Sequence, residues 1–217
     1  MLIDLEYPEP KPVTLPAEKT LLVIVDMAKE TCDPAGRSYH PARGQMVPVI
    51  ADLRLRVRQA GGHVVHTQSV RTADQLEFTV FNNRLRHLEG TWDVEFVDPL
   101  TPAPDEPVVV KRTHDCFYKT DMEEVLEQLD IRPGDGRVIV TGTAARGCVQ
   151  CAFTGFSIRD YYVYMPMDCV AQTDPKDALQ AFSMYVNFGY RYNTTSTLSS
   201  MIWLTPAREG TLAPTAG

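Results

Sequence analysis

Three residues able to take part in covalent chemistry each follow an apolar run typical of a buried strand. Cys148 lies at the end of VTGTAARGCV, in which such a strand ends in a glycine turn and a helix begins. Asp26 lies near the end of LLVIVDM, and Lys111 near the end of PVVVKR. Free backbone N–H groups and the helix dipole at a helix N-terminus stabilise a thiolate. The pattern therefore predicts that Cys148 is a nucleophile.

Together these side chains suit amide hydrolysis through an acyl-enzyme. The Cys148 thiol would attack a carbonyl carbon, and Asp26 would take the thiol proton and return it to the leaving amine. A positive charge on Lys111 would keep the aspartate ionised and favour the thiolate.

Alternating strand and helix patterns predict how these residues meet. The fold class expected is α/β, a three-layer α/β/α arrangement with a mostly parallel sheet of about six strands. Strands are predicted at 21–27, 63–69, 107–112, 137–143 and 162–169, with an edge strand near 191–195. Helices are predicted at 46–60, 120–129 (with Thr120 as N-cap), 148–161 and 174–189. In such a sheet the active site lies at the carboxyl ends of the strands, where all three residues fall.

Only one domain is expected in a chain of 217 residues. It should span residues 20–205, after a proline-rich N-terminal arm (1–19) without strand or helix periodicity and before a flexible C-terminal tail (206–217). Residues 70–106 form a long irregular insert after a strand, which is a common place for a substrate-covering loop.

The composition excludes several classes of partner. A net charge of -7 argues against binding to nucleic acid or to an acidic membrane surface. Neither a transmembrane run nor an export signal is recognisable, and five cysteines are an odd number for a disulfide framework. The chain is therefore expected in the cytoplasm.

The same residues resemble the isochorismatase-like cysteine hydrolases over about residues 18–197. In that family an aspartate ends the first strand, as Asp26 does here, and a lysine ends the third, as Lys111 does in VVVKRTHDCFYKT. A phenylalanine and a threonine follow that lysine, matching Phe117 and Thr120. The family's nucleophile lies in a Gly-x-x-Thr-x-x-Cys-Val pattern, which aligns with GTAARGCV, and a strand ending like MPMDCV usually follows.

This resemblance implies further features of the site. A non-proline cis peptide is implied between Thr143 and Ala144, and the N–H groups of Ala144 and Cys148 would form the oxyanion hole. The family commonly assembles into dimers or tetramers, and no organic cofactor is implied. This chain departs from the family pattern at positions that leave the three catalytic candidates intact but alter their surroundings, namely Ala28, Cys116, Ala145 and Cys151.

Loop residues near the strand ends are candidates for the substrate pocket. An arginine could bind a carboxylate or carbonyl group of a small substrate. The aromatic residues near 91–96 could line the pocket or serve a subunit interface instead. The pocket candidates are Arg71, Trp92, His114, Phe117 and Tyr118. Relatives that hydrolyse nicotinamide carry a histidine cluster near the second strand; TQSVRTADQLEF has no histidine, so no metal site is predicted.

The interpretation favoured is a cysteine hydrolase cleaving the C–N bond of a small non-peptide amide, ureide or carbamoyl compound, with no cofactor. One alternative is vinyl-ether hydrolysis of isochorismate type, against which the presence of Cys148 argues. A second is a non-catalytic binding or scaffold protein. The spacing Cys148-Val-Gln-Cys151 also fits a thioredoxin-like redox pair, but Asp26 and Lys111 would then be unexplained.

Overall fold

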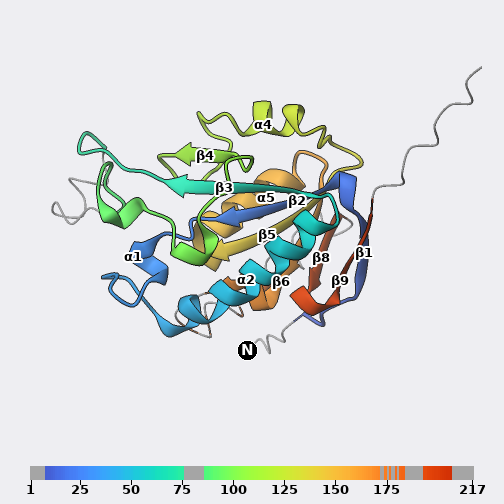
Figure 1. The fold of residues 1–217 in the computed structure, drawn as a ribbon, viewed down its shortest axis with the longest axis horizontal. Helices are drawn as coiled ribbons and strands as arrows, with labels where there is room; N and C mark the ends of the chain where they lie inside the picture. The colour runs from blue at the N-terminus through green and yellow to red at the C-terminus, as the bar shows by residue number, and fades with distance from the viewer. Residues whose placement is uncertain are drawn as a thin grey trace, which may run out of the picture.

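The centre of the molecule is a seven-stranded parallel sheet, with β2, β3 and β5 running across the view in Figure 1. The structure, a computed structural model, describes residues 8–75, 86–171, 174, 176, 179, 181–183 and 193–206. The strand order is β4–β3–β2–β5–β6–β8, with β7 paired to β5. The strands are β2 (Thr20–Val25), β3 (His63–Ser69), β4 (Val108–Lys111), β5 (Arg137–Thr143), β6 (Tyr162–Pro166), β7 (Val170–Ala171) and β8 (Thr194–Thr197). The predicted α/β class is confirmed.

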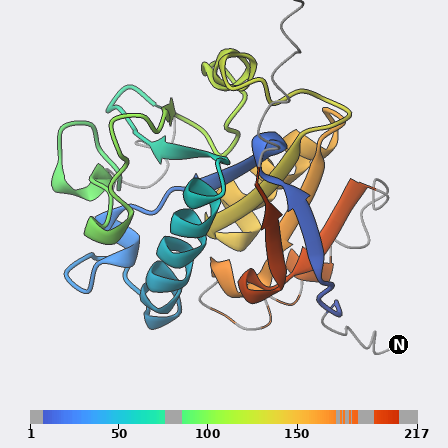
Figure 2. The ribbon, with the colours of Figure 1, turned by 45° about the vertical axis from the view of Figure 1, so that its right-hand side comes forward.

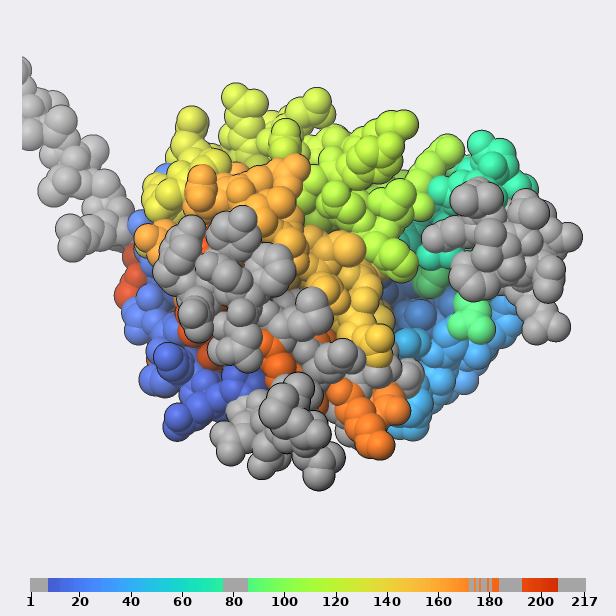
Figure 3. All heavy atoms as spheres, turned by 180° about the vertical axis from the view of Figure 1, so that it is seen from behind, coloured from blue at the N-terminus to red at the C-terminus, as the bar shows by residue number. Residues whose placement is uncertain are grey.

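Helices cover both faces of this sheet. The longest helix, α2, lies against one face of the sheet, and α4 and α5 lie on the other. Figure 3 shows this second face, with the region of α4 in lime and that of α5 in yellow to orange. Successive β2 side chains point to opposite faces, so Ile24 belongs to the core cluster that includes Ile50 of α2, and Val23 to the one that includes Phe153 of α5. The helices are α1 (Lys29–Cys32), α2 (Pro41–Gln59), α4 (Met122–Gln128) and α5 (Gln150–Ser157).

Short helical turns fill most of the remaining connections. The insert between β3 and β4 holds two of them among its described residues and is otherwise irregular, as predicted for 70–106; residues 76–85 of it lie outside the described part. The 3-10 turns are η1 (Ala17–Lys19), η2 (Trp92–Val94), η3 (Asp98–Leu100), η5 (Met167–Cys169) and η7 (Ser199–Met201), and η4 (Ala145–Val149) is a π turn.

One prediction about the N-terminal arm is wrong. Val13–Pro16 forms a strand, β1, that pairs in parallel with β9 (Ile202–Thr205) in a separate two-stranded sheet, side by side in Figure 2. Leu15 is buried in the core beside α2, together with Ile202. A strand of four residues between two prolines has too little local pattern to be recognised, and its pairing partner lies near the other end of the chain.

Several element boundaries also differ from the prediction. The first long helix begins at Pro41 rather than residue 46, because His40 Nδ1 accepts a hydrogen bond from Ala42 N (3.2 Å) and Pro41 occupies the first turn. The helix predicted at 120–129 begins at Met122, with Asp121 rather than Thr120 as its N-cap. Thr120 Oγ1 still accepts a hydrogen bond from Met122 N (3.4 Å).

The second half of the chain follows the predicted order of elements with shorter spans. The strand predicted at 162–169 ends at Pro166, and η5 follows it. The helix predicted at 148–161 is α5, which ends at Ser157. The edge strand expected near 191–195 is β8, at the end of the sheet. Most of the helix predicted at 174–189 lies outside the described residues.

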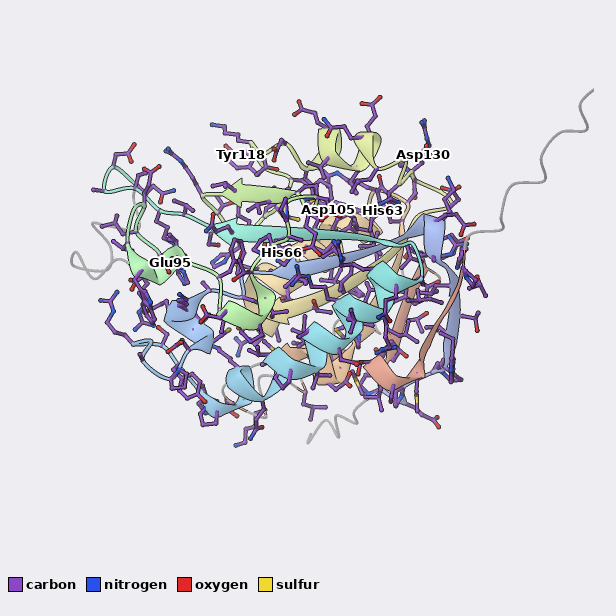
Figure 4. The ribbon with its side chains drawn as sticks, in the orientation of Figure 1. His63, His66, Glu95, Asp105, Tyr118 and Asp130 are labelled. Carbon is purple, nitrogen blue, oxygen red and sulfur yellow. The ribbon has the colours of Figure 1, made fainter. Side chains whose placement is uncertain are left out.

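A buried charged network fastens α2 to the loop before β4. Glu106 accepts hydrogen bonds from Arg54 Nε (2.9 Å) and His66 Nε2 (3.0 Å), and His66 lies in the middle of β3 (Figure 4). Burial lowers the pKa of His66 to about 4, against the opposing effect of Glu106. Burial alone would raise the pKa of Glu106, but hydrogen bonds from Arg54 and from Ala103 N lower it to about 2. The pair is therefore a neutral imidazole beside a carboxylate.

Two further findings concern the cysteines and the helices. All five cysteines are free thiols. Within the described residues, every helix is too short or too polar to cross a membrane.

Candidate active site

Asp26 lies directly after β2, at the carboxyl end of the central strand. Its backbone φ is 50°, a left-handed conformation that few residues other than glycine adopt, although aspartate tolerates it. Its two carboxylate oxygens accept hydrogen bonds from β3: Thr67 Oγ1 donates to Oδ1 and Ser69 Oγ to Oδ2, each over 2.8 Å. The carboxylate is thus held from the neighbouring strand.

Lys111 ends β4 and turns its ammonium toward the same carboxylate. Only 1% of the residue is exposed. Its Nζ lies 2.8 Å from Asp26 Oδ2, 2.8 Å from Ser69 Oγ and 3.1 Å from the carbonyl oxygen of Thr113. A buried ammonium is costly unless it is paired and hydrogen-bonded, and here it has both kinds of partner.

Cys148 lies in η4, two residues before α5. Its Sγ is 3.2 Å from Lys111 Nζ and 3.2 Å from His114 Nδ1, and the thiol also interacts with the carboxylate of Asp26. The structure therefore brings the three residues singled out in the sequence to one place, from three different strand ends.

The charges in this cluster determine its protonation. Burial would raise the pKa of Asp26, but the Lys111 ammonium and the hydrogen bonds outweigh it, so the pKa of that carboxyl lies below its usual value. Although burial opposes it, the Asp26 carboxylate raises the pKa of Lys111. Burial and the Asp26 charge raise the pKa of Cys148 to about 12, and Lys111 lowers it only in part. Cys148 is thus a neutral thiol beside an ionised carboxylate, whereas the sequence suggested a favoured thiolate.

The backbone before Cys148 has an unusual shape. Gly142 has a φ of 110°, and a Cβ at this position would lie 2.1 Å from the carbonyl oxygen of Val25, so only glycine fits. The peptide bond between Thr143 and Ala144 is cis. From there the chain turns through η4, within which Gly147 has non-helical angles, and enters α5.

Among the predicted pocket residues, His114 lies closest to Cys148. It follows β4 on an exposed loop and contacts the Cys148 thiol. Arg71 is half-buried after β3, where its backbone N–H donates a hydrogen bond to the carbonyl oxygen of His87 (2.8 Å). Trp92 begins η2 in the insert and is 38% exposed.

The two aromatic candidates after β4 have different surroundings. Phe117 is buried in the core, where its ring meets that of Phe156 edge to face (4.9 Å between centroids) and stacks under the Arg159 guanidinium (3.9 Å). Tyr118 is 54% exposed at the periphery (Figure 4), with the Lys119 ammonium 5.2 Å from its ring.

Two residues that the sequence did not single out position the Asp26 carboxylate. Thr67 and Ser69 both hydrogen-bond Asp26, and Ser69 also accepts from Lys111. A signal was present, because polar residues two apart at the end of an apolar strand point to the same face. Within the described residues, no three His, Cys, Asp or Glu side chains gather in a way that could hold a metal ion.

Comparisons of structure show that solved structures share this fold. N-carbamoylsarcosine amidase from Thermoplasma acidophilum superimposes with a TM-score of 0.70 at 24% identity, covering 83% of this chain and 96% of that one. A cysteine hydrolase from Pseudomonas syringae pv. phaseolicola superimposes with a TM-score of 0.74 at 21% identity, covering 92% and 95%. These similarities concern the fold.

Comparisons of sequence identify the family. Ureidoacrylate amidohydrolase RutB of a Methylorubrum extorquens strain is 28% identical over 192 residues, which cover 76% of this chain and 75% of the relative. The family profile of the isochorismatase domain matches residues 20–197. Since this match spans most of the chain and includes all three clustered residues, the protein belongs to the isochorismatase family.

Proposed function

We propose that this protein hydrolyses the C–N bond of a small non-peptide amide, ureide or carbamoyl compound through a thioester on Cys148. The observation that carries this proposal is the position of the Cys148 thiol, 3.2 Å from the Lys111 ammonium and near enough to the Asp26 carboxylate for that charge to raise its pKa. A neutral thiol with a carboxylate base nearby is suited to acyl transfer from an amide.

In the proposed acylation, Asp26 accepts the thiol proton as Sγ forms a bond to the substrate carbonyl carbon. Asp26 then gives this proton to the leaving nitrogen as the C–N bond breaks, so the carboxylate is ionised again when the thioester has formed. Lys111 keeps Asp26 ionised in the resting enzyme and stabilises negative charge on sulfur as the proton leaves. Water then hydrolyses the thioester to release the acid.

The backbone N–H groups of Ala144 and Cys148 are the proposed donors to the oxyanion. Donors aimed at the developing negative charge lower the barrier more than a ground-state contact does. Both belong to the turn that joins β5 to α5, the segment that also carries the nucleophile.

The relatives support the proposed substrate class. One is named for ureidoacrylate and one for N-carbamoylsarcosine, which favours a ureide or carbamoyl compound here as well. Arg71 and Trp92 remain candidates for contacts to the substrate, and a guanidinium suits a carboxylate or carbonyl oxygen. We also propose a homo-oligomer, a dimer or a tetramer, working in the cytoplasm.

Ammonia release from a panel of small amides and ureides tests this function. The wild type is compared with Cys148→Ala, and Cys151→Ala serves as the matched control because it removes a thiol three residues away on α5. The proposal expects ammonia from at least one compound with the wild type and the control, and none with Cys148→Ala. Activity that survives Cys148→Ala would move the chemistry to another group.

A further inference from the structure

The thiol of Cys148 has a second titratable neighbour besides Asp26. His114 Nδ1 lies 3.2 Å from Sγ, as close as the Lys111 ammonium. The two neighbours differ in their access to water: Lys111 is 1% exposed, whereas His114 is an exposed residue of the loop after β4. The sulfur therefore lies between a buried cation and an imidazole that solvent can reach.

The His114 imidazole has no role in the proposed acylation step. Asp26 takes the thiol proton and returns it to the leaving nitrogen, and Lys111 supplies the charge. Hydrolysis of the thioester again needs a base, which takes a proton from water, and an acid, which gives one to the departing sulfur. His114 is exposed, so water from solvent can reach its imidazole.

We propose that His114 is the acid–base catalyst of the deacylation half of the reaction. As a water oxygen bonds to the thioester carbonyl carbon, His114 Nδ1 accepts a proton from that water. As the C–S bond then breaks, the same Nδ1–H gives its proton to Sγ, which the contact of 3.2 Å allows. The products are the free acid and the neutral Cys148 thiol, so the imidazole ends as it began.

The position of the imidazole is supported by the backbone next to the nucleophile. Gly147 has no side chain, and a Cβ at this residue would lie 3.7 Å from His114 Nδ1 and 3.9 Å from Cε1. The ring therefore lies beside the turn that carries Cys148, and the glycine leaves the space between them open.

This inference rests on the proposed thioester mechanism, and an activated acyl donor tests it separately from the substrate. We would use p-nitrophenyl acetate, since its leaving group needs no proton. Stopped-flow absorbance gives a burst of nitrophenolate for acylation and a steady phase for deacylation, and intact-protein mass spectrometry detects the acetyl adduct. His114→Gln is compared with His63→Gln, which changes a histidine at the opposite end of β3 (Figure 4).

The inference expects His114→Gln to keep the burst rate within a few-fold, to slow the steady phase about 100-fold, and to accumulate acetyl-Cys148. His63→Gln should behave as the wild type. Because imidazole hydrolyses p-nitrophenyl acetate by itself, rescue is measured on acetylated His114→Ala freed of the ester: added imidazole should speed the loss of acetyl-Cys148 seen by mass spectrometry, which a structural role would not produce.

Two results would overturn the inference alone: a steady phase unchanged in His114→Gln, or a slowed burst without accumulated adduct. Nitrophenolate release by the wild type no faster than without enzyme, or release that persists in Cys148→Ala, would instead remove the proposed nucleophile and with it the mechanism on which this inference rests.

Discussion

The Lys111 ammonium lies 2.8 Å from Asp26 Oδ2 at a position where Lys111 is 1% and Asp26 6% exposed. Ser69 Oγ joins the two, accepting from Lys111 and donating to Asp26, each over 2.8 Å. A buried pair of this kind orders the site because each charge is unfavourable without the other.

Removing one member of this pair should cost stability as well as activity. Lys111→Met leaves the Asp26 carboxylate buried without its counter-ion, and the free energy of unfolding should fall by about 3–5 kcal/mol. Urea unfolding at pH 7.5 measures the change. The double variant Asp26→Asn with Lys111→Met should recover most of the loss, and a double variant no more stable than Lys111→Met would contradict the coupling.

Replacing Asp26 should make Cys148 more reactive while it stops turnover. Burial and the Asp26 charge raise the pKa of Cys148, and Lys111 lowers it. In Asp26→Asn the charge is gone while burial and Lys111 remain, so the pKa of Cys148 should fall, the thiolate fraction at pH 8 should rise and alkylation by iodoacetamide should become faster. Peptide fragmentation by mass spectrometry separates the label on Cys148 from that on Cys151. Slower labelling of Cys148 in Asp26→Asn, across pH 6–10, would count against this electrostatic account.

The buried histidine of β3 should make stability fall in mild acid. The pKa of His66 is about 4 in the folded chain, against a usual value of 6.5. Between these values the unfolded chain binds a proton that the folded chain does not, so stability decreases as pH falls from 6.5 to 4, by at most about 3 kcal/mol. Glu106, with a pKa of about 2, stays ionised throughout this window.

Urea unfolding at pH 7.5, 6 and 5 measures this dependence. His66→Gln should flatten the slope between pH 6.5 and 4, whereas His114→Gln, which removes an exposed histidine, should leave it in place. An equal slope in His66→Gln and the wild type would assign the acid sensitivity to other groups.

Two glycines with positive φ should respond differently to a methyl group. In Gly142→Ala the Cβ would overlap the carbonyl oxygen of Val25 at 2.1 Å, in addition to the strain of a φ of 110°. Gly134 has a φ of 87° but open space around it. Thermal unfolding should therefore show a loss of about 1–2 kcal/mol for Gly134→Ala and at least about 4 kcal/mol for Gly142→Ala. Equal losses of unfolding free energy in the two variants would mean that backbone strain, and not the overlap with Val25, determines the effect at Gly142.

Much of the fold was predictable because its signals are local. A strand buried on both faces needs a continuous apolar run, and LLVIVDM and RVIVTGT supply one each. The β1–β9 pair was not predictable, because its hydrogen bonds join Val13–Pro16 to Ile202–Thr205, and neither segment shows a strong pattern by itself. The helix start at Pro41 was missed because it depends on capping by His40 rather than on apolar spacing.

By itself the sequence determined which residues reach the carboxyl ends of the strands. Asp26, Lys111 and Cys148 each follow an apolar segment whose strand character is encoded in adjacent residues, and parallel strands bring such ends to one edge of the sheet. Only the tertiary structure decided what surrounds them: Ser69 between the charges, His114 against the sulfur, and a neutral rather than ionised thiol. Protonation and contact depend on burial and on distances between segments far apart in the chain, which no local pattern carries.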